Sequence, residues 1–472
     1  MNTPGNPSRA HRAGRLITRL YTEEPMSKLP DFRFPEGFRW GTATSAHQVE
    51  GNLTNNDWWA AEQAGGYVYR NQASGLACDW WNRAEEDFDR MAEMNQNAHR
   101  LSVEWSRIEP SPGHWDEDAL ARYREMLQGL IARGIEPMVT LHHFTNPLWV
   151  AERGGWENRD IVAWFERYTR KVVSALGDLT RLWCTINEPA VMVSQAYVLG
   201  KWPPGKKDIN AALRVGLNVM RAHAAAYRAI HELVPGAQVG MAKHMMVWQP
   251  WRPWLPIDRF LTRLVQQLFN YLPLSMVTEG IVRVPGRRPV RLPEAANTLD
   301  WLGVNYYQRY RVRFSPFAAR ALFARQCTKP GVLKGPGDWG EIHPRGLSQT
   351  LRALWRRYRL PMIITENGIP DERDQHRPGF IVTHLHQVWQ SIRQGIPVMG
   401  YYFWSLVDNF EWTEGYDPRF RFGLIGVDFK TQVRHIRRSG RLYAAICREG
   451  GIIPEIVEQY TPSLAPALFG ER

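Results

Sequence analysis

The chain has 472 residues, of which 44% are hydrophobic and 22% charged, and its formal net charge at pH 7 is +12. This length and apolar content exclude a disordered protein, and no apolar run reaches the ~18 residues of a membrane-spanning helix. The positive charge is not matched by a nucleic-acid-binding motif, which favours a solvated basic surface and argues against a nucleic-acid partner.

The first residues contain several arginines but no apolar stretch long enough for a secretory signal. We interpret residues 1–30 as a flexible basic leader, with Met26 as a candidate natural start. Residues 31–460 are expected to form a single domain, because no Ser/Gly-rich linker divides them. Residues 461–472 are expected to form a C-terminal tail.

The four cysteines lie far apart and form no CxxC pair. They are Cys78, Cys184, Cys327 and Cys447. This pattern is typical of reduced thiols in a cytoplasmic protein and argues against a disulfide framework or a zinc site. The histidines show no metal-ligand spacing with cysteine or aspartate, so we expect neither a metal nor a cofactor.

Eight strand-like runs alternate with helical stretches along the chain. The strands are predicted at residues 38–42, 98–103, 136–141, 182–186, 238–242, 301–304, 362–365 and 398–404. Apolar stripes such as Leu120, Tyr123, Leu127 and Leu130 predict helices between them. This alternation predicts an α/β fold, a single (β/α)8 TIM barrel with extended loops after the strands, and such barrels carry function at the carboxyl ends of their strands.

Two glutamates follow strand-like runs at such ends. Glu188 follows the run 182–186 and precedes Pro189, while Glu366 ends the apolar run 360–364 and precedes Asn367-Gly368. A single glutamate after a strand is more often a helix first-turn acid or a surface ion pair. Because the same context occurs twice, the sequence favours an enzyme with paired carboxylates.

The stretches Thr185-Ile186-Asn187-Glu188-Pro189 and Ile364-Thr365-Glu366-Asn367-Gly368 resemble the acid/base and nucleophile signatures of family 1 glycoside hydrolases, the retaining β-glucosidases. The resemblance extends from about Phe34 to about Ala445. It implies hydrolysis of terminal β-D-glucosides, and also of β-galactosides and β-fucosides, by double displacement, with Glu366 as nucleophile and Glu188 as acid/base. Repulsion between the two carboxylates should raise the pKa of Glu188 toward roughly 6–7.

The resemblance also implies roles for other residues at the strand ends. Arg100 is expected to lie near Glu366 and favour its ionised form, and Tyr307 to hydrogen-bond it. The residues expected to hold the sugar are Gln48, His143, Asn187, Asn305, Trp404, Glu411 and Trp412. Phe144 stands where the family usually has tryptophan, which removes an indole donor. The carboxylate of Glu411 would repel a 6-phosphate, which argues against a phospho-β-glucosidase.

Three other functions remain open on the sequence. A transglycosylase would use the same residues, with apolar Trp202 near the aglycone entrance helping to exclude water. A non-catalytic sugar-binding protein would not need two glutamates. Residues 245–282 resemble the family least; their tryptophans, including Trp248 and Trp254, belong either to an exposed patch for a membrane or partner subunit or to a long loop packed on the barrel. The expected partner is a small β-glycoside or oligosaccharide, and the sequence does not predict the oligomeric state.

Overall fold

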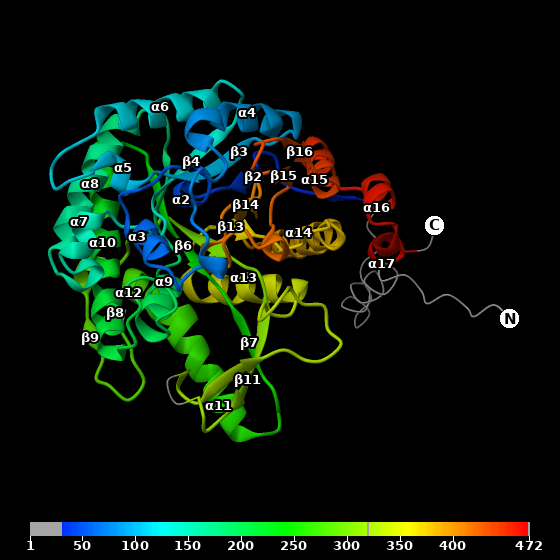
Figure 1. The fold of residues 1–472 in the computed structure, drawn as a ribbon. Helices are drawn as coiled ribbons and strands as arrows, with labels where there is room; N and C mark the ends of the chain where they lie inside the picture. Colours follow the sequence, from blue (N-terminus) through cyan, green and yellow to red (C-terminus); the bar gives the residue numbers. More distant parts are fainter. Residues whose placement is uncertain (1–30, 319–320, 471–472) are drawn as a thin grey trace.

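The computed structural model describes residues 31–318 and 321–470 (Figure 1). Eight parallel strands close into a barrel at its centre. In barrel order they are β2 (Arg39–Ala43), β3 (Ala98–Ser102), β4 (Glu136–His142), β5 (Leu182–Asn187), β6 (Gln238–His244), β10 (Trp301–Asn305), β13 (Met362–Asn367) and β14 (Val398–Trp404). Strand β14 pairs with β2 and closes the ring. The predicted (β/α)8 fold and all eight predicted strands are confirmed.

The barrel strands are buried on both faces, which explains their continuous apolar character. At the start of β5 the side chains alternate between two separate clusters. Leu182 and Cys184 belong to the cluster inside the barrel, whereas Trp183 belongs to the core between strands and helices. The two-residue period of a strand therefore fills both layers, and the polar residues that matter for function gather where the strands end.

Helices form a ring around the barrel (Figure 1). The long ones are α4 (Trp80–Glu93), α6 (Glu117–Ile131), α8 (Ile161–Leu176), α10 (Ile209–Leu233), α13 (Pro344–Tyr358), α14 (Arg377–Arg393) and α15 (Arg438–Glu449). In α6 the predicted stripe Leu120, Tyr123, Leu127 and Leu130 is buried. The Asp116 side chain caps its N-terminus by accepting a hydrogen bond from the Ala119 N–H at 2.8 Å.

Short elements cover the two ends of the barrel. They are β1 (Phe32–Arg33), α2 (Ala46–Val49), α3 (Asp57–Ala64), α5 (Trp105–Ile108), α7 (Leu148–Glu152), α9 (Pro189–Val193), β8 (Ile281–Val282), β9 (Val290–Arg291), β15 (Ile425–Val427), β16 (Arg434–Ile436), β17 (Gly451–Ile452), α16 (Pro454–Tyr460) and α17 (Ala465–Phe469). Strand β1 pairs with β17, and Phe32 stacks on Phe469 at 5.1 Å between ring centroids. The predicted leader, residues 1–30, lies outside the described residues. In the part of the chain that the structure describes, no helix combines the length and apolar character needed to cross a membrane.

Residues 245–282 form regular elements instead of one long loop. They are β7 (Val247–Pro250), α11 (Pro256–Gln266), the π-helix η4 (Gln267–Tyr271), α12 (Leu272–Glu279) and β8. Strand β7 belongs to a separate three-stranded sheet with β11 (Arg309–Phe314) and β12 (Ala324–Cys327). Within the segment Trp248 is buried and Trp254 is 77% exposed. The expectation of a long loop is therefore wrong, and an exposed patch for a membrane or partner subunit stays a prediction.

Candidate active site

The two predicted glutamates lie at the same end of the barrel, on strands β5 and β13, with β6 and β10 between them. A chain of hydrogen bonds links them. Asn305 Nδ2 donates to Glu188 Oε1 at 2.8 Å and to Asn187 Oδ1 at 3.2 Å. Arg100 Nη2 donates to Asn187 Oδ1 at 2.7 Å, and its Nη1 donates to Glu366 Oε1 at 2.5 Å. The two carboxylates therefore belong to one buried polar network.

Glu366 is held at both oxygens. Arg100 binds Oε1, and the Tyr307 hydroxyl donates to Oε2 at 2.6 Å. Arg100 is fully buried and is fixed on its other side by a 2.9 Å hydrogen bond from Nε to Thr140 Oγ1. The backbone carbonyl of Glu366 accepts a hydrogen bond from the Tyr306 N–H at 2.9 Å. This arrangement fixes the position of the carboxylate and provides charge-assisted hydrogen bonds to its ionised form.

Glu188 reaches the site through an unusual backbone conformation. Its φ of 45° and ψ of 54° place it in the left-handed region, between the end of β5 and Pro189, the first residue of α9. This conformation costs a non-glycine residue roughly 1–2 kcal/mol. Phe144 and Trp412, which also lie in the site, have φ values of 75° and 44°. Such strained positions cluster at functional sites.

The electrostatics of the pair differ from the sequence-based expectation. Burial raises the pKa of Glu366 to about 7, with Arg100 and Tyr307 opposing this and the charge of Glu188 adding to it. Burial also acts to raise the pKa of Glu188, but the charges of His244 and Lys243, with hydrogen bonds from His244 and Asn305, lower it below its ordinary value. The expectation of a raised pKa at Glu188 is therefore wrong.

His244 is the residue that sequence reasoning missed. Its Nδ1 lies 3.1 Å from Glu188 Oε1, the same oxygen that Asn305 binds. The predicted fifth strand ended at residue 242, whereas β6 continues to His244. Lys243 and His244 therefore lie outside the predicted strand. Lys243 and His244 are two basic residues at the end of an apolar strand, and this strand follows the one that carries Glu188. That pattern is the sequence signal that could have identified His244.

Gln48 connects two of the predicted sugar-binding loops. Its Nε2 donates to the Phe410 carbonyl at 2.9 Å and to Glu411 Oε2 at 3.3 Å. Its Oε1 accepts a hydrogen bond from Ser45 Oγ at 2.6 Å. Burial, together with the charges of Glu414 and Glu366, raises the pKa of Glu411 well above its ordinary value. Gln48 and Glu411 thus form a polar corner next to the carboxylate pair.

His143 lies between the two predicted tryptophans. Its ring stacks on Trp404 at 5.9 Å and on Trp412 at 6.0 Å between centroids. Asn187 Nδ2 contacts His143 Nε2 at 3.1 Å, while His143 Nδ1 is buried and has no partner among the described residues. Burial and the charge of Arg100 lower the pKa of His143 well below its ordinary value. The ring is therefore neutral.

Aromatic side chains line the region around Trp412. Trp202 is buried and packs against Phe144 at 4.8 Å and Trp412 at 5.8 Å, and Trp58 contacts Trp412 at 4.7 Å. Trp202 therefore places an indole beside the phenylalanine that replaces the usual tryptophan. Apart from Arg100, which lies within β3, every site residue predicted from the sequence lies at or after the carboxyl end of a barrel strand.

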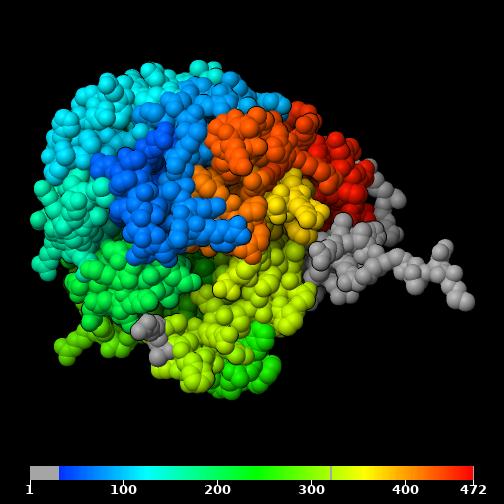
Figure 2. All heavy atoms as spheres, in the orientation of Figure 1, coloured from blue at the N-terminus to red at the C-terminus, as the bar shows by residue number. Residues whose placement is uncertain are grey.

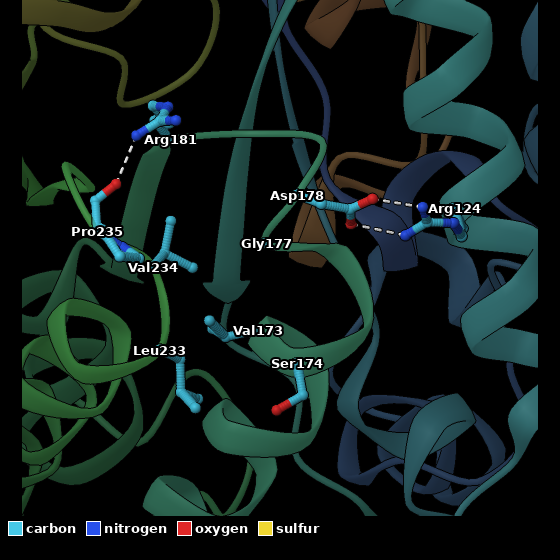
Figure 3. Close-up of a pocket in the computed structure, with 9 residues that line it drawn as sticks. All are labelled: Arg124, Val173, Ser174, Gly177, Asp178, Arg181, Leu233, Val234 and Pro235. Atoms are coloured by element: carbon cyan, nitrogen blue, oxygen red, sulfur yellow. Dashed lines mark hydrogen bonds and ion pairs between the residues drawn. The ribbon is translucent and has the colours of Figure 1, made fainter.

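A separate hollow lies at the other end of the barrel (Figure 3). It is lined by Arg124, Val173, Ser174, Gly177, Asp178, Arg181, Leu233, Val234 and Pro235. Arg181 immediately precedes β5, and the other residues include the last turns of α8 and α10. The Arg124–Asp178 ion pair borders it at 2.5 Å. None of the predicted site residues lines this hollow.

Among the described residues, no group of three or more His, Cys, Asp or Glu side chains is arranged to hold a metal ion.

Known proteins resemble this chain over almost its full length. The sequence model for "Glycosyl hydrolase family 1" matches residues 31–280 and 290–452. Beta-glucosidase A of Thermotoga maritima is 32% identical over 89% of this chain and 99% of its own. A beta-galactosidase of Sulfolobus acidocaldarius is 30% identical over 90% of this chain and 96% of its own. The structure of a beta-glycosidase from Pyrococcus horikoshii has a TM-score of 0.84 and 37% identity, covering 91% and 98% of the two chains.

Proposed function

Because this chain belongs to glycosyl hydrolase family 1, and is therefore a retaining β-glycosidase, we propose that its substrates are small terminal β-D-glucosides, with β-D-galactosides and β-D-fucosides also accepted. The observation that carries the proposal is the network joining Glu188 to Glu366 through Asn305, Asn187 and Arg100. A retaining mechanism needs two carboxylates within reach of one anomeric centre.

In the proposed mechanism Glu366 attacks the anomeric carbon and forms a covalent glycosyl ester. Arg100 and Tyr307 aim its carboxylate and stabilise its charge. The bond from the anomeric carbon to the leaving oxygen breaks as Glu188 donates a proton to that oxygen. Water then attacks the ester, Glu188 takes a proton from the water, and Glu366 leaves as a carboxylate. Both carboxyl groups end in their starting states.

The geometry of Glu188 supports its role as acid and base. Asn305 and His244 both contact Oε1, which leaves Oε2 without a protein partner among the described residues. We propose that Oε2 carries the proton to the leaving oxygen and later receives one from water.

The sugar is proposed to lie on Trp404, because the C–H faces of pyranoses pack well on aromatic rings. His143, Gln48 and Glu411 are proposed to supply hydrogen-bonding groups for its hydroxyls, with Asn187 and Trp412 completing the binding set. The site is proposed to accept galactosides as well as glucosides, because relatives of this chain include proteins named beta-galactosidases.

Transglycosylation is a second candidate activity, favoured by one observation. Trp202 packs against Phe144 and Trp412, and the family resemblance places its loop at the aglycone entrance, so this side of the site is apolar. An apolar acceptor site favours an alcohol over water as the group that attacks the glycosyl ester. Product analysis with an added alcohol separates the two activities: alkyl glycoside indicates transfer, and free sugar alone indicates hydrolysis.

The widely spaced cysteines, all unpaired, support the proposal that the enzyme acts in the cytoplasm.

The decisive test uses Glu366→Ala and Glu188→Ala with an aryl β-glucoside and added azide. Glu366→Ala should lose nearly all turnover and regain it with azide as an α-glucosyl azide, because azide attacks from the face that Glu366 occupied. Glu188→Ala should give the β-glucosyl azide, because azide then replaces the water of the second step. Substantial turnover by Glu366→Ala without azide would overturn the assignment. A panel of aryl glycosides that differ only in the sugar tests the proposed substrate range.

A further inference from the structure

A small unit made of β7, α11, β11 and β12 projects from the barrel, at the bottom of the view in Figures 1 and 2. Strands β7 and β11 are parallel neighbours, so their carboxyl ends lie at the same end of the unit. The loop 251–255 follows β7, and the loop 315–323 connects β11 to β12. The Phe314 N–H donates to Asp258 Oδ1 in the first turn of α11 at 2.8 Å. We call the end formed by residues 251–260, 314–318 and 321–323 the tip.

The tip gathers exposed aromatic side chains. Every exposed tryptophan and phenylalanine among the described residues lies there: Trp254 at 77%, Phe260 at 59%, Phe317 at 97%, Phe314 at 39% and Phe323 at 43%. Ile257 and Leu322 at the tip are exposed as well. Single exposed apolar residues are normal on a soluble surface, whereas a cluster of this kind marks an interaction site.

These side chains are not needed for the unit's own core. That core consists of Trp248, Leu261, Val312 and Ala324, all buried. Leu261 packs inward from α11, whereas Phe260 lies on the exposed side of the helix together with Arg259 and Arg263. The exposed aromatic ring is therefore not covered by the described residues.

The unpaired charge around the tip is positive. Segments 247–271 and 309–327 contain eight arginines and one acidic residue, Asp258; Arg309 and Arg311, in β11, pair with the buried Glu341 from outside these segments. Asp258 is buried and paired with Arg252 at 2.8 Å. The exposed arginines Arg259, Arg263 and Arg325 form no salt bridge with another described residue. Aromatic side chains surrounded by unpaired arginines are typical of a surface that enters the interface of an anionic bilayer.

We propose that the tip docks this enzyme onto an anionic phospholipid bilayer. A second copy of the chain fits the same surface poorly, because a two-fold interface through the tip would bring the arginines of both copies together. Strands β7 and β11 follow β6 and β10 at the end of the barrel that carries Glu188 and Glu366. Docking would therefore hold the catalytic end of the barrel near the lipid surface.

The test is co-sedimentation of the full chain with vesicles of phosphatidylglycerol or of phosphatidylcholine. We expect at least about tenfold more pelleted protein with the anionic vesicles, and less as salt is added. The variant Trp254→Ser/Phe260→Ser/Phe317→Ser should stay in the supernatant. A matched control, Ile131→Ser/Ile209→Ser/Val433→Ser, removes exposed apolar side chains from other parts of the surface and should pellet like the wild type.

Three outcomes would overturn the proposal. The wild type could remain in the supernatant with both kinds of vesicle, or the tip variant could pellet as well as the wild type. Light scattering could instead show that the wild type is a dimer and the tip variant a monomer, while the wild type binds no vesicles. That result would make the tip an interface between copies of the chain. Circular dichroism and thermal unfolding check that both triple variants are folded. Because pelleting is measured as protein and not as turnover, its result is independent of the proposed substrate.

Discussion

Both oxygens of Glu366 accept hydrogen bonds, from Arg100 and Tyr307, whereas the contacts of Glu188 from Asn305 and His244 converge on one oxygen. The difference matches what the two steps of the mechanism require. A nucleophile has to be ionised and aimed along one line. An acid that becomes a base has to release and regain a proton, so one oxygen must stay accessible to substrate and water.

The charges around the two carboxylates also differ. At Glu366 burial outweighs Arg100 and leaves the pKa at about 7. At Glu188 the basic groups at the end of β6 outweigh burial. The two carboxyl groups titrate as one coupled system, and the first step requires the shared proton to be on Glu188. His244 therefore opposes the reactive protonation state, and it lies on the side of the network that the family resemblance did not describe.

Removing the carboxyl group of Glu188 should give the largest loss of kcat/KM that depends on the leaving group of the substrate. In Glu188→Ala, kcat/KM for alkyl β-glucosides should fall by about 10²–10⁴-fold, because a poor leaving group needs its proton in the transition state. For an activated aryl glucoside such as a dinitrophenyl glucoside, the first step should be almost unchanged. Steady-state and burst kinetics across a series of phenols measure this difference. Equal losses for all leaving groups would contradict an acid role for Glu188.

Arg100→Lys should weaken the Glu366 side of the network. Lysine keeps the positive charge but cannot reach Thr140, Asn187 and Glu366 together, as the planar guanidinium does. We expect kcat/KM to fall by about 10²–10³-fold for every leaving group. This equal loss of kcat/KM for all leaving groups distinguishes Arg100→Lys from Glu188→Ala. A loss confined to poor leaving groups would place Arg100 with the acid instead of the nucleophile.

Tyr307→Phe removes one hydrogen bond to Glu366 and has a matched control in the next residue. A hydrogen bond to a charged group contributes about 1.5–3 kcal/mol, which corresponds to a loss of about 10–100-fold in kcat/KM. Tyr306 donates its hydroxyl to the His343 carbonyl at 2.7 Å, away from the carboxylates. Tyr306→Phe should lower the free energy of unfolding by about 1 kcal/mol and leave kcat/KM nearly unchanged. Equal effects of both variants on kcat/KM would mean that the Tyr307 contact is only structural.

The barrel could be predicted from sequence because its strands are continuous apolar runs, buried on both faces and separated by helices of regular period. The positions of Glu188 and Glu366 followed from the same pattern, since each ends such a run. The environment of Glu188 did not follow from it. His244 reaches that carboxylate from the neighbouring strand, and a contact between strands cannot be read from the periodicity of either one.

The tip shows a different limit of sequence reasoning. Trp248 and Trp254 are the same residue type six positions apart, yet one is buried and the other is 77% exposed. The side chains of 314–318 and 321–323 join those of 254–260 only because β11 pairs with β7, about sixty residues apart in sequence. The apolar composition predicted an unusual segment, but only the pairing of these strands shows which side chains face outward together.

Replacing His244 tests how much this side chain lowers the pKa of Glu188, and we expect a smaller effect than for the variants above. His244→Asn removes a basic group 3.1 Å from Glu188 Oε1, so the pKa of Glu188 should rise. Because Glu188 must be protonated in the first step, the basic limb of the kcat/KM profile should move to higher pH, by on the order of one pH unit.

Lys243→Met provides a graded comparison with His244→Asn. Burial lowers the pKa of Lys243 to about 7, and its charge lowers the pKa of Glu188 less than that of His244 does. The Lys243 variant should therefore move the basic limb in the same direction by a smaller amount. A purely structural role for His244 would lower kcat/KM at all pH values and leave the limb in place. A larger shift in Lys243→Met than in His244→Asn would instead make the buried lysine the group that opposes protonation of Glu188.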